Sequence, residues 1–282
     1  MAGHIGISRS RVQELIVQEE VRVVGHGAKA NYRVKGGDII QWTLPEAVDD
    51  EPQAEAIRLQ VLHEDEALLV IDKPAGLVVH PGAGHTEGTL LNGLLYYDQN
   101  FAQVERAGLV HRLDKDTSGV LVVAKSTVMQ QALMKQFKAR EVTKRYVALV
   151  QGLPPGKLSI ENQLGRDPHN RKKQAVLSEG GRHAHSIIML KEPLVESALV
   201  EVDIKTGRTH QIRVHLAHAG YPIIGDPVYG GKQRLPIQAP RQMLHAAHLS
   251  FTHPLNKKVL SCSAHIPPDM QEVVDQLRVQ HG

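Results

Sequence analysis

The stretch that decides the fold is Gly-Leu-Val-His-Arg-Leu-Asp-Lys-Asp-Thr-Ser-Gly-Val-Leu-Val-Val-Ala-Lys, residues 108–125. Apolar, largely β-branched residues flank a polar core that runs from His111 to Gly119, so the flanks are predicted to be strands and the core to be the turn between them. In this turn Asp114 stands between Arg112 and Lys115. Opposite charges nearby favour the charged form of a carboxyl group, so we expect Asp114 to stay ionised. Taken alone, the segment could equally be a hairpin loop with solvated charges.

The composition is that of a globular protein. The 282 residues can form one large domain with a small appendage, and the 41% of hydrophobic residues suffices for a core. The net charge of +3 permits a nucleic acid partner without requiring one. The single cysteine, Cys262, excludes an intramolecular disulfide framework. No apolar run reaches the ~20 residues of a membrane helix, and we expect a cytoplasmic, monomeric protein with no membrane association.

From Ile57 onward the pattern predicts an α+β domain, residues 57–282. Short strands are followed by isolated helices without a βαβ rhythm, which favours a mostly antiparallel mixed sheet. The predicted strands are 68–72, 144–151 and 198–205, and the predicted helices are 126–140 and 209–219, the second ended by Gly220.

Residues 1–44 are predicted to form a separate small domain. A helix starts at Ser8, and strands over 21–24 and 39–42 are separated by a turn at Gly25 and Gly27. This layout resembles the alpha-L RNA-binding motif, and the resemblance implies that Arg9 and Arg11 contact RNA. Only seven residues precede Ser8, where the motif normally has another helix, so the domain is expected to be truncated. A capping lobe with solvated arginines is the alternative. Residues 45–56 are acidic and contain prolines, which is typical of a linker.

The string His111-Arg112-Leu113-Asp114-Lys115-Asp116-Thr117-Ser118-Gly119 resembles the signature of the RluA-type pseudouridine synthases. The resemblance continues through residues 72–81, 144–150 and 205–215. It implies the pseudouridine synthase fold for the larger domain and a catalytic role for Asp114, with Arg112 beside it.

The resemblance also implies the residues that support this aspartate. Tyr146 corresponds to the active-site tyrosine of the family, and its ring is suited to stacking on an extruded uracil. Arg213 is expected to pair with Asp114, with Arg208 as the alternative, because a charge inside a closed cleft requires a partner. Leu244 is expected to lie against the other face of the base.

Further residues are candidates for RNA contact. Residues 72–81 are expected to line the cleft, with Lys73 and His80 near RNA, although Lys73 could also be a surface lysine on a turn. An insertion between strands, residues 165–174, is predicted either to bind phosphates or to be a solvated loop. Its basic residues are Arg166, Arg171, Lys172 and Lys173. The 17 histidines have no accompanying zinc motif, so no metal site is expected.

These features together predict an RNA pseudouridine synthase that flips a uridine out of the RNA and needs no cofactor, because the reaction is redox-neutral and retains the base. Asp114 could act as a nucleophile or as a base. The segment Val-Val-His-Pro-Gly-Ala-Gly-His, residues 78–85, is most similar to the members of the family that act on 23S ribosomal RNA. The alternatives are a transfer RNA substrate, a silent RNA-binding or ribosome assembly protein, and a carboxylate-dependent hydrolase that would use Asp116 as its second carboxylate.

Overall fold

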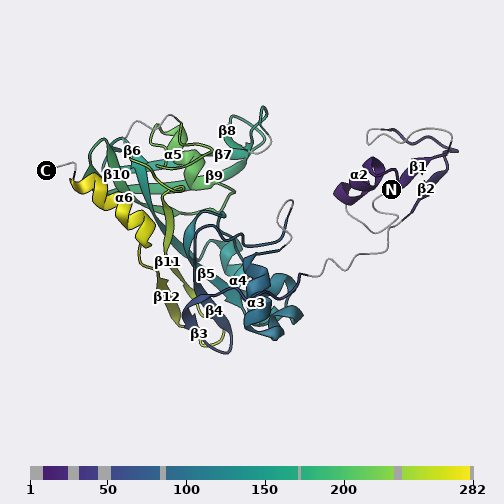
Figure 1. The fold of residues 1–282 in the computed structure, drawn as a ribbon, viewed down its shortest axis with the longest axis horizontal. Helices are drawn as coiled ribbons and strands as arrows, with labels where there is room; N and C mark the ends of the chain where they lie inside the picture. The colour runs from purple at the N-terminus through teal and green to yellow at the C-terminus, as the bar shows by residue number, and fades with distance from the viewer. Residues whose placement is uncertain are drawn as a thin grey trace. The chain divides into compact units, whose positions relative to one another are not determined.

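The computed structural model describes residues 9–24, 32–43, 52–82, 87–170, 173–231 and 237–279, in two compact units formed from residues 1–51 and 52–282 (Figure 1). The larger unit begins at Pro52, before the expected start at Ile57. The Asn92 side chain donates a hydrogen bond to the Gln53 carbonyl oxygen at 2.7 Å, and the Glu55 amide donates to the Asn92 carbonyl oxygen at 3.1 Å. Residues 52–56 are therefore bound to the larger unit, and the rest of the expected linker lies outside the described residues.

The smaller unit contains one helix and one antiparallel strand pair. Helix α2 (Arg9–Val17) is followed by β1 (Val21–Val23), which pairs with β2 (Ile40–Trp42). Leu15 and Val21 are buried between the helix and the strands. Ser8, Gly25 and Gly27, which were predicted to cap the helix and to form the turn, lie outside the described residues.

The larger unit is built on a ten-stranded mixed sheet in the order β3-β4-β5-β11-β6-β10-β9-β7-β8, with β12 paired to β11. Every strand pair is antiparallel except β5 with β11, so the predicted α+β class with a mostly antiparallel sheet is confirmed. The strands are β3 (Gln60–Glu64), β4 (Leu68–Lys73), β5 (Ser118–Ala124), β6 (Thr143–Gln151), β7 (Lys157–Arg166), β8 (Gln174–Leu177), β9 (Arg182–Leu194), β10 (Ser197–Ile204), β11 (Leu244–Thr252) and β12 (Val259–Ser263). The helices are α3 (Leu90–Tyr97), α4 (Thr127–Ala139), α5 (Gln211–His218) and α6 (Pro268–Val279), with short 3-10 turns η1 (Gln99–Gln103) and η2 (Glu105–Gly108).

The flank before His111 differs from the prediction, because it is not a strand. Only Leu109 forms an isolated bridge, with Val123, after the 3-10 turn η2. Gly108 explains the difference: it has a φ of +75°, and a Cβ added to it would lie 1.9 Å from the carbonyl oxygen of Ala124. The chain therefore meets the end of β5 in a left-handed conformation, which limits the pairing to a single bridge.

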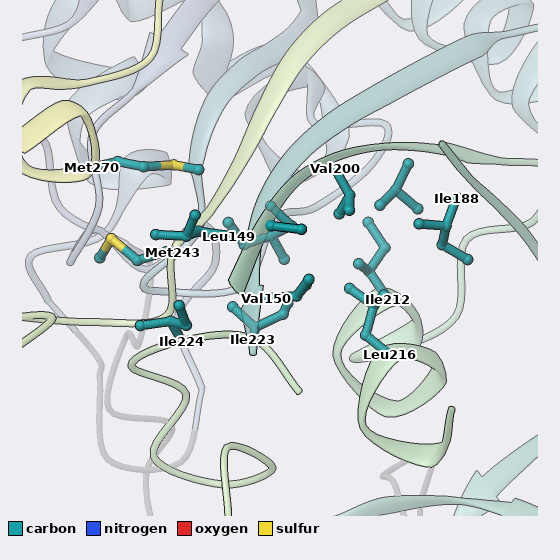
Figure 2. Close-up of a cluster of buried hydrophobic side chains, with 14 of the residues drawn as sticks. Leu149, Val150, Ile188, Val200, Ile212, Leu216, Ile223, Ile224, Met243 and Met270 are labelled. Carbon is teal, nitrogen blue, oxygen red and sulfur yellow. The ribbon is translucent and has the colours of Figure 1, made fainter. Parts of the chain in front are cut away.

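The core differs between the two halves of the sheet. In β4 and β5 successive apolar residues are buried on both faces: Leu69 and Ile71 pack with α3, whereas Leu68 and Val70 pack with Leu133 of α4. Both strands are therefore continuous hydrophobic runs rather than alternating ones. In the other half, β6, β10, α5 and α6 share one cluster, shown in Figure 2. Its labelled members are Leu149, Val150, Ile188, Val200, Ile212, Leu216, Ile223, Ile224, Met243 and Met270.

The two halves meet where β5 lies beside β11. The pairing joins Ser118 to His245 and Gly119 to Ala246. Gly119 has a φ of +114°, and a Cβ there would lie 2.2 Å from the carbonyl oxygen of Ala246. Only glycine permits this approach, and it places the loop before β5 between the two halves of the sheet.

Candidate active site

A buried lysine, Lys73, holds the loop that carries Asp114. Lys73 is fully buried, and its ammonium group donates to the carbonyl oxygens of Lys115 at 3.0 Å, Pro74 at 2.7 Å and Leu77 at 2.9 Å. These three acceptors match the three protons of the group. The Gly76 amide donates to the same Lys115 carbonyl oxygen at 2.9 Å. Residues 72–81 thus lie against the loop, but the expectation that Lys73 contacts RNA is wrong, because its amine is fully buried and its hydrogen-bond donors are used by carbonyl oxygens inside the protein.

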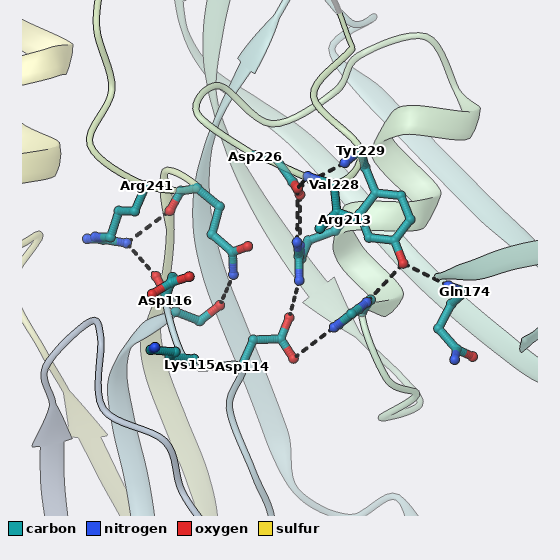
Figure 3. A network of polar contacts seen from close by, with 12 residues as sticks. Asp114, Lys115, Asp116, Gln174, Arg213, Asp226, Val228, Tyr229 and Arg241 are labelled. Atoms are coloured by element: carbon teal, nitrogen blue, oxygen red, sulfur yellow. Dashed lines mark hydrogen bonds and ion pairs between the residues drawn. The ribbon is translucent and has the colours of Figure 1, made fainter. Parts of the chain in front are cut away.

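A second buried basic residue, Arg241, holds the residues that lead from Asp114 into β5. Arg241 donates to the carbonyl oxygen of Asp116 at 3.0 Å and to the hydroxyl of Ser118 at 3.3 Å, and it forms a bidentate pair with Asp269 at 2.6 and 3.1 Å. The neighbouring Gln242 side chain donates to the Thr117 hydroxyl at 2.8 Å. The residues that follow Asp114 are therefore fixed by contacts with Arg241 and its neighbour, and Figure 3 shows Arg241 beside Asp116.

Arg213 connects Asp114 to a second carboxylate. Its Nη1 atom donates to Oδ2 of Asp114 at 3.0 Å, while Nε and Nη2 donate to the two oxygens of Asp226 at 2.7 and 2.9 Å (Figure 3). The Asp114 side chain is 20% exposed, that of Arg213 is 6% exposed and that of Asp226 is 0% exposed. The ion pair expected between Arg213 and Asp114 is present.

Asp226 fixes the direction of this guanidinium. Besides Arg213 it accepts hydrogen bonds from the amides of Val228 and Tyr229 at 2.8 and 3.0 Å. Burial alone would raise the pKa of Asp226, but the hydrogen bonds from Arg213 and the two amides outweigh burial and lower it. The Tyr229 ring lies 5.1 Å below the guanidinium, and such cation–π contacts add to the stability of the arrangement. Asp226 therefore fixes the orientation of the guanidinium, and in this orientation Nη1 points at Asp114.

Asp114, Tyr146 and Leu244 come together at an opening in the surface. They line a recess of about 60 Å³. The recess shares Asp114, Tyr146 and Arg208 with a cleft of about 490 Å³. Burial and the nearby Asp114 raise the pKa of the Tyr146 phenol, so this group stays neutral. The larger volume lies within the range of roughly 300–1,000 Å³ that is usual for small-ligand sites.

The cleft is strongly basic. Its charged lining residues are seven cations and one carboxylate, Asp114. Burial lowers the pKa of Arg208, and so do the neighbouring charges of Arg182 and Arg140, which shows that the cations lie close enough to repel one another. Such a surface attracts polyanions. The cations are Arg112, Lys138, Arg140, Lys144, Arg182, Lys205 and Arg208.

His111 supports the loop as a neutral ring. Its Nε2 atom accepts a hydrogen bond from the Val122 amide of β5 at 3.1 Å, and the ring stacks on Phe137 with centroids 4.9 Å apart. Burial, with repulsion from Lys144, lowers the pKa of His111 to about 3. The histidine of the 111–119 string therefore ties the loop to the strand that follows it.

The segment before α5 is held by Gln211. The side-chain oxygen of Gln211 accepts from the Thr206 hydroxyl at 2.7 Å and from the Arg208 amide at 3.0 Å, and its nitrogen donates to the His185 carbonyl oxygen at 3.0 Å. Arg208 donates through Nε to the His183 carbonyl oxygen at 3.0 Å, so it lines the cleft without pairing with Asp114.

The other residues expected to bind RNA are scattered. Arg112 is exposed and lines the cleft, whereas Arg166 is exposed and Lys173 is half-buried outside the cleft lining. His80 is partly buried, and its Nε2 atom is enclosed without a hydrogen-bond partner among the described residues. The side chains of Arg9 and Arg11, and the whole of Arg171 and Lys172, lie outside the described part of the chain.

Sequence reasoning missed Asp226, Tyr229 and Arg241. The Asp226-Pro227 pair was a usable signal, because aspartate before proline favours a turn in which the carboxylate accepts from the amides that follow. Nothing in the sequence around Arg241 indicated its partners, which come from Asp116 and Asp269. In the part of the chain that the structure describes, no three His, Cys, Asp or Glu side chains are grouped to hold a metal ion. Within that same part, no helix is long and apolar enough to cross a membrane.

Known proteins resemble this chain over most of its length. Residues 67–218 match the RNA pseudouridylate synthase family. A "Ribosomal large subunit pseudouridine synthase D" of Xanthomonas campestris pv. campestris is 43% identical over 282 residues, which cover 96% of this chain and 85% of that relative. An "Uncharacterized RNA pseudouridine synthase" of Chloroflexus aurantiacus is 45% identical over 274 residues, covering 96% of this chain and 86% of the relative.

Solved structures agree. "Human RNA Pseudouridylate Synthase Domain Containing 4" superposes with a TM-score of 0.62 at 25% identity, covering 78% of this chain and 93% of that chain. The chain therefore belongs to the RNA pseudouridylate synthase family. It is an RNA pseudouridine synthase, an isomerase, as the 111–119 string implied.

Proposed function

We propose that this enzyme converts specific uridines of large-subunit ribosomal RNA to pseudouridine, with Asp114 as the catalytic group. The observation that carries the proposal is the ion pair of Asp114 with Arg213 in the recess, which shares Asp114 with the basic cleft. The choice of ribosomal RNA is supported by the relatives named "Ribosomal large subunit pseudouridine synthase D", from Xanthomonas campestris pv. campestris and from Neisseria meningitidis.

The substrate base has to leave its stack before it reacts. The glycosidic carbon of a uridine within structured RNA is inaccessible, so the nucleotide is flipped into the recess. There the Tyr146 ring stacks on one face of the uracil and Leu244 contacts the other. Stacking on an aromatic ring contributes roughly 1–3 kcal/mol per base, which offsets part of the cost of extrusion.

Asp114 acts at the exposed sugar, either as a nucleophile at the anomeric carbon or as the base that begins an elimination. Both routes require an ionised carboxylate in a closed site. Arg213 supplies the opposite charge, and Asp226 keeps Arg213 from turning away. The Tyr146 phenol stays neutral, so it adds no further negative charge beside Asp114. The cleaved uracil turns within the recess and rejoins the sugar through carbon, and no cofactor takes part.

The surrounding cations bind the RNA backbone. Phosphate contacts position an RNA without reading its sequence, and the cleft offers lysines and arginines from α4, β6, β9 and the 205–208 segment. We extend the proposal to the N-terminal unit as an alpha-L RNA-binding domain that adds affinity through Arg9 and Arg11, and to Arg166, Arg171, Lys172 and Lys173 as outer phosphate contacts. The proposal takes the enzyme to act as a monomer, and ribosomal RNA as substrate supports a cytoplasmic location.

Mapping pseudouridine in cellular RNA tests the proposal. Carbodiimide modification followed by primer extension is applied to RNA from cells with the gene, without it, and with Asp114→Asn restored. We expect stops in large-subunit ribosomal RNA that vanish without the gene and return with the wild type but not with D114N. If the sites that vanish lie in transfer RNA instead, the substrate is transfer RNA and not ribosomal RNA. If D114N restores the sites, Asp114 is not the catalytic group. An unchanged map would leave a protein that binds RNA without modifying it.

A further inference from the structure

His210 lies beside the catalytic carboxylate and is so far without a role. It is the residue before α5, and its backbone has a φ of 55° and a ψ of 18°. A non-glycine residue in this left-handed region is uncommon and draws attention to the position. Its side chain forms no cap on the helix; it is 22% exposed and lines the recess with Asp114 and Tyr146. The backbone conformation thus directs this ring into the site rather than toward the helix end.

The hydrogen bonds of Tyr229 favour one tautomer of His210. The backbone amide of Gln174 donates to the Tyr229 hydroxyl oxygen at 2.8 Å, and the same hydroxyl lies 2.9 Å from Nδ1 of His210. An amide can only donate, so the single proton of the phenol is available for Nδ1. This favours the tautomer in which Nδ1 accepts that proton and Nε2 carries hydrogen.

The protonated nitrogen faces Asp114. Nε2 of His210 is 3.9 Å from Oδ1 of Asp114, while Oδ2 accepts from Arg213. The ring is neutral, because burial lowers the pKa of His210. Of the charged groups that face the ring, Arg213 and Arg112 also lower this pKa, whereas Asp114 and Asp226 oppose them. Each oxygen of Asp114 therefore has a donor directed at it. The cationic Arg213 is in hydrogen-bond contact with Oδ2, whereas the neutral His210 is slightly too far from Oδ1 for a hydrogen bond.

We propose that His210 is a positioning residue that closes onto Asp114 when RNA fills the site and donates its Nε2 hydrogen to Oδ1. The inference rests on the proposed role of Asp114. Catalytic hydrogen bonds are often long without substrate and shorten in the complex, which fits the 3.9 Å separation. With both oxygens held, the carboxylate keeps one orientation toward the sugar. The proton remains on His210 throughout, so the ring is not the base that removes a proton from the uracil.

Two amide variants show whether His210 acts as a hydrogen-bond donor or as a base. Glutamine at this position carries an N–H close to the place of Nε2, whereas asparagine tolerates the left-handed backbone but is too short to reach Asp114. We expect His210→Asn to lower kcat by about 10- to 100-fold with KM little changed, because the hydrogen bond to the charged carboxylate is lost. His210→Gln should stay within about threefold of the wild type, as should His218→Gln, which changes an exposed histidine at the far end of the same helix.

The activity outcomes all decide the proposal. Equal losses in H210Q and H210N would show that the ring itself acts, as a base would, and full activity in H210N would remove His210 from the reaction. Thermal unfolding of each variant separates misfolding from either result. Asp114→Asn measured in the same assay distinguishes a failure of the His210 proposal from a failure of the proposed function, because an active D114N variant would overturn the role of Asp114 itself.

The tautomer gives a readout that does not depend on activity. Nitrogen NMR of the full-length protein with labelled histidine should show the Nε2–H form of His210 in the wild type. Tyr229→Phe keeps the ring below Arg213 but removes the hydroxyl, so the His210 signals should move toward a mixture of tautomers and kcat should fall. An Nδ1–H form in the wild type, or unchanged signals in Y229F, would overturn the assignment.

Discussion

Arg241 donates a hydrogen bond to the backbone carbonyl oxygen of Asp116 at 3.0 Å, across 125 residues of sequence. A side chain remote in sequence thus sets the path of the loop that presents Asp114. Fixed geometry of this kind matters because small displacements of a catalytic group slow the reaction strongly. Part of the catalytic capacity of the site therefore depends on residues that never touch RNA.

Arg241→Met should remove activity by loosening this loop. The variant leaves the carbonyl oxygens of Asp116, Gln242 and Leu244 without their donor, and each unpaired buried group costs roughly 1–3 kcal/mol. We expect a large fall in kcat together with a lower melting temperature. Asp269→Asn is the matched control: Asp269 is 38% exposed, so water can replace part of the pair and the loss should be smaller. Equal effects of the two variants would contradict the role of the carbonyl contacts.

Arg213→Ala should be the most damaging single change among the arginines of the cleft and the recess. It leaves Asp226 fully buried without its partner, and removing one member of a buried ion pair typically costs about 3–5 kcal/mol. We expect loss of activity and a large loss of stability in chemical denaturation. Arg208→Ala should mainly weaken RNA binding, because Arg208 pairs with the His183 carbonyl oxygen rather than with a carboxylate. If Arg208→Ala lost more activity and stability than Arg213→Ala, the roles assigned to the two arginines would be exchanged.

His111 predicts a pH dependence of stability. Its pKa is about 3 in the folded protein and 6.5 in its unperturbed form, so below pH 6.5 the unfolded chain binds a proton that the folded chain does not. Stability is therefore lost as the pH falls. Between pH 6.5 and about 4 the loss should reach about 3 kcal/mol, at roughly 1.4 kcal/mol per pH unit.

Urea unfolding across that pH range measures this effect. In His111→Gln the side-chain oxygen can still accept from Val122 but does not titrate, so the acid-dependent loss should be smaller than in the wild type. His218→Gln, at an exposed site, should follow the wild-type curve. Parallel curves for all three proteins would show that His111 is not kept neutral.

The cleft cations should contribute to RNA affinity through salt-dependent contacts. Lys138→Gln and Arg182→Gln change exposed residues on two different elements of the cleft lining. Each lost phosphate contact should reduce the slope of log affinity against log salt by roughly 0.7–0.9, with kcat at saturating RNA unchanged. Lys135→Gln lies on the same helix as Lys138 but outside the cleft lining, and it should leave the slope as in the wild type. A slope that also fell in K135Q would indicate only a general effect of net charge.

Removal of residues 1–51 should leave a folded and active catalytic unit. The structure divides at this point, and Asp114, Tyr146 and Arg213 all lie beyond it. RNA binding should weaken with a shallower salt slope, while kcat at saturating RNA survives. An insoluble product would show that the smaller unit contributes to the core, and an unchanged slope would show that it does not contact RNA.

The sequence predicted four of the ten strands of the sheet, β4, β5, β6 and β10, because these strands are locally marked. The runs at Leu68–Lys73 and Thr143–Gln151 are apolar and bounded by polar or turn residues, and a strand needs little else to be recognised. The segment before His111 failed for a nonlocal reason. Its conformation depends on how closely Gly108 approaches Ala124, and no periodicity records such an approach.

The same distinction between local and nonlocal information applies to the site. Asp114 and Arg213 were accessible through the resemblance of short strings, whereas the partners of Arg213 and of the loop come from other segments. Lys73 illustrates the limit most clearly. A lysine beside a proline in a turn is usually exposed, and only the three carbonyl oxygens that surround its ammonium group explain its burial. Burial of a charge depends on partners that the sequence does not place next to it.

The pairing of Arg241 with Asp269 has a consequence for how the enzyme is made. Synthesis proceeds at about 5–20 residues per second, so a nascent chain exposes Asp114 several seconds before Arg213, and Arg241 gains its carboxylate only when α6 has emerged. Contacts of such long sequence separation form late in folding. The protein therefore acquires its activity in one step near the end of its own translation, and a prematurely terminated chain lacking α6 is expected to be inert rather than partly active.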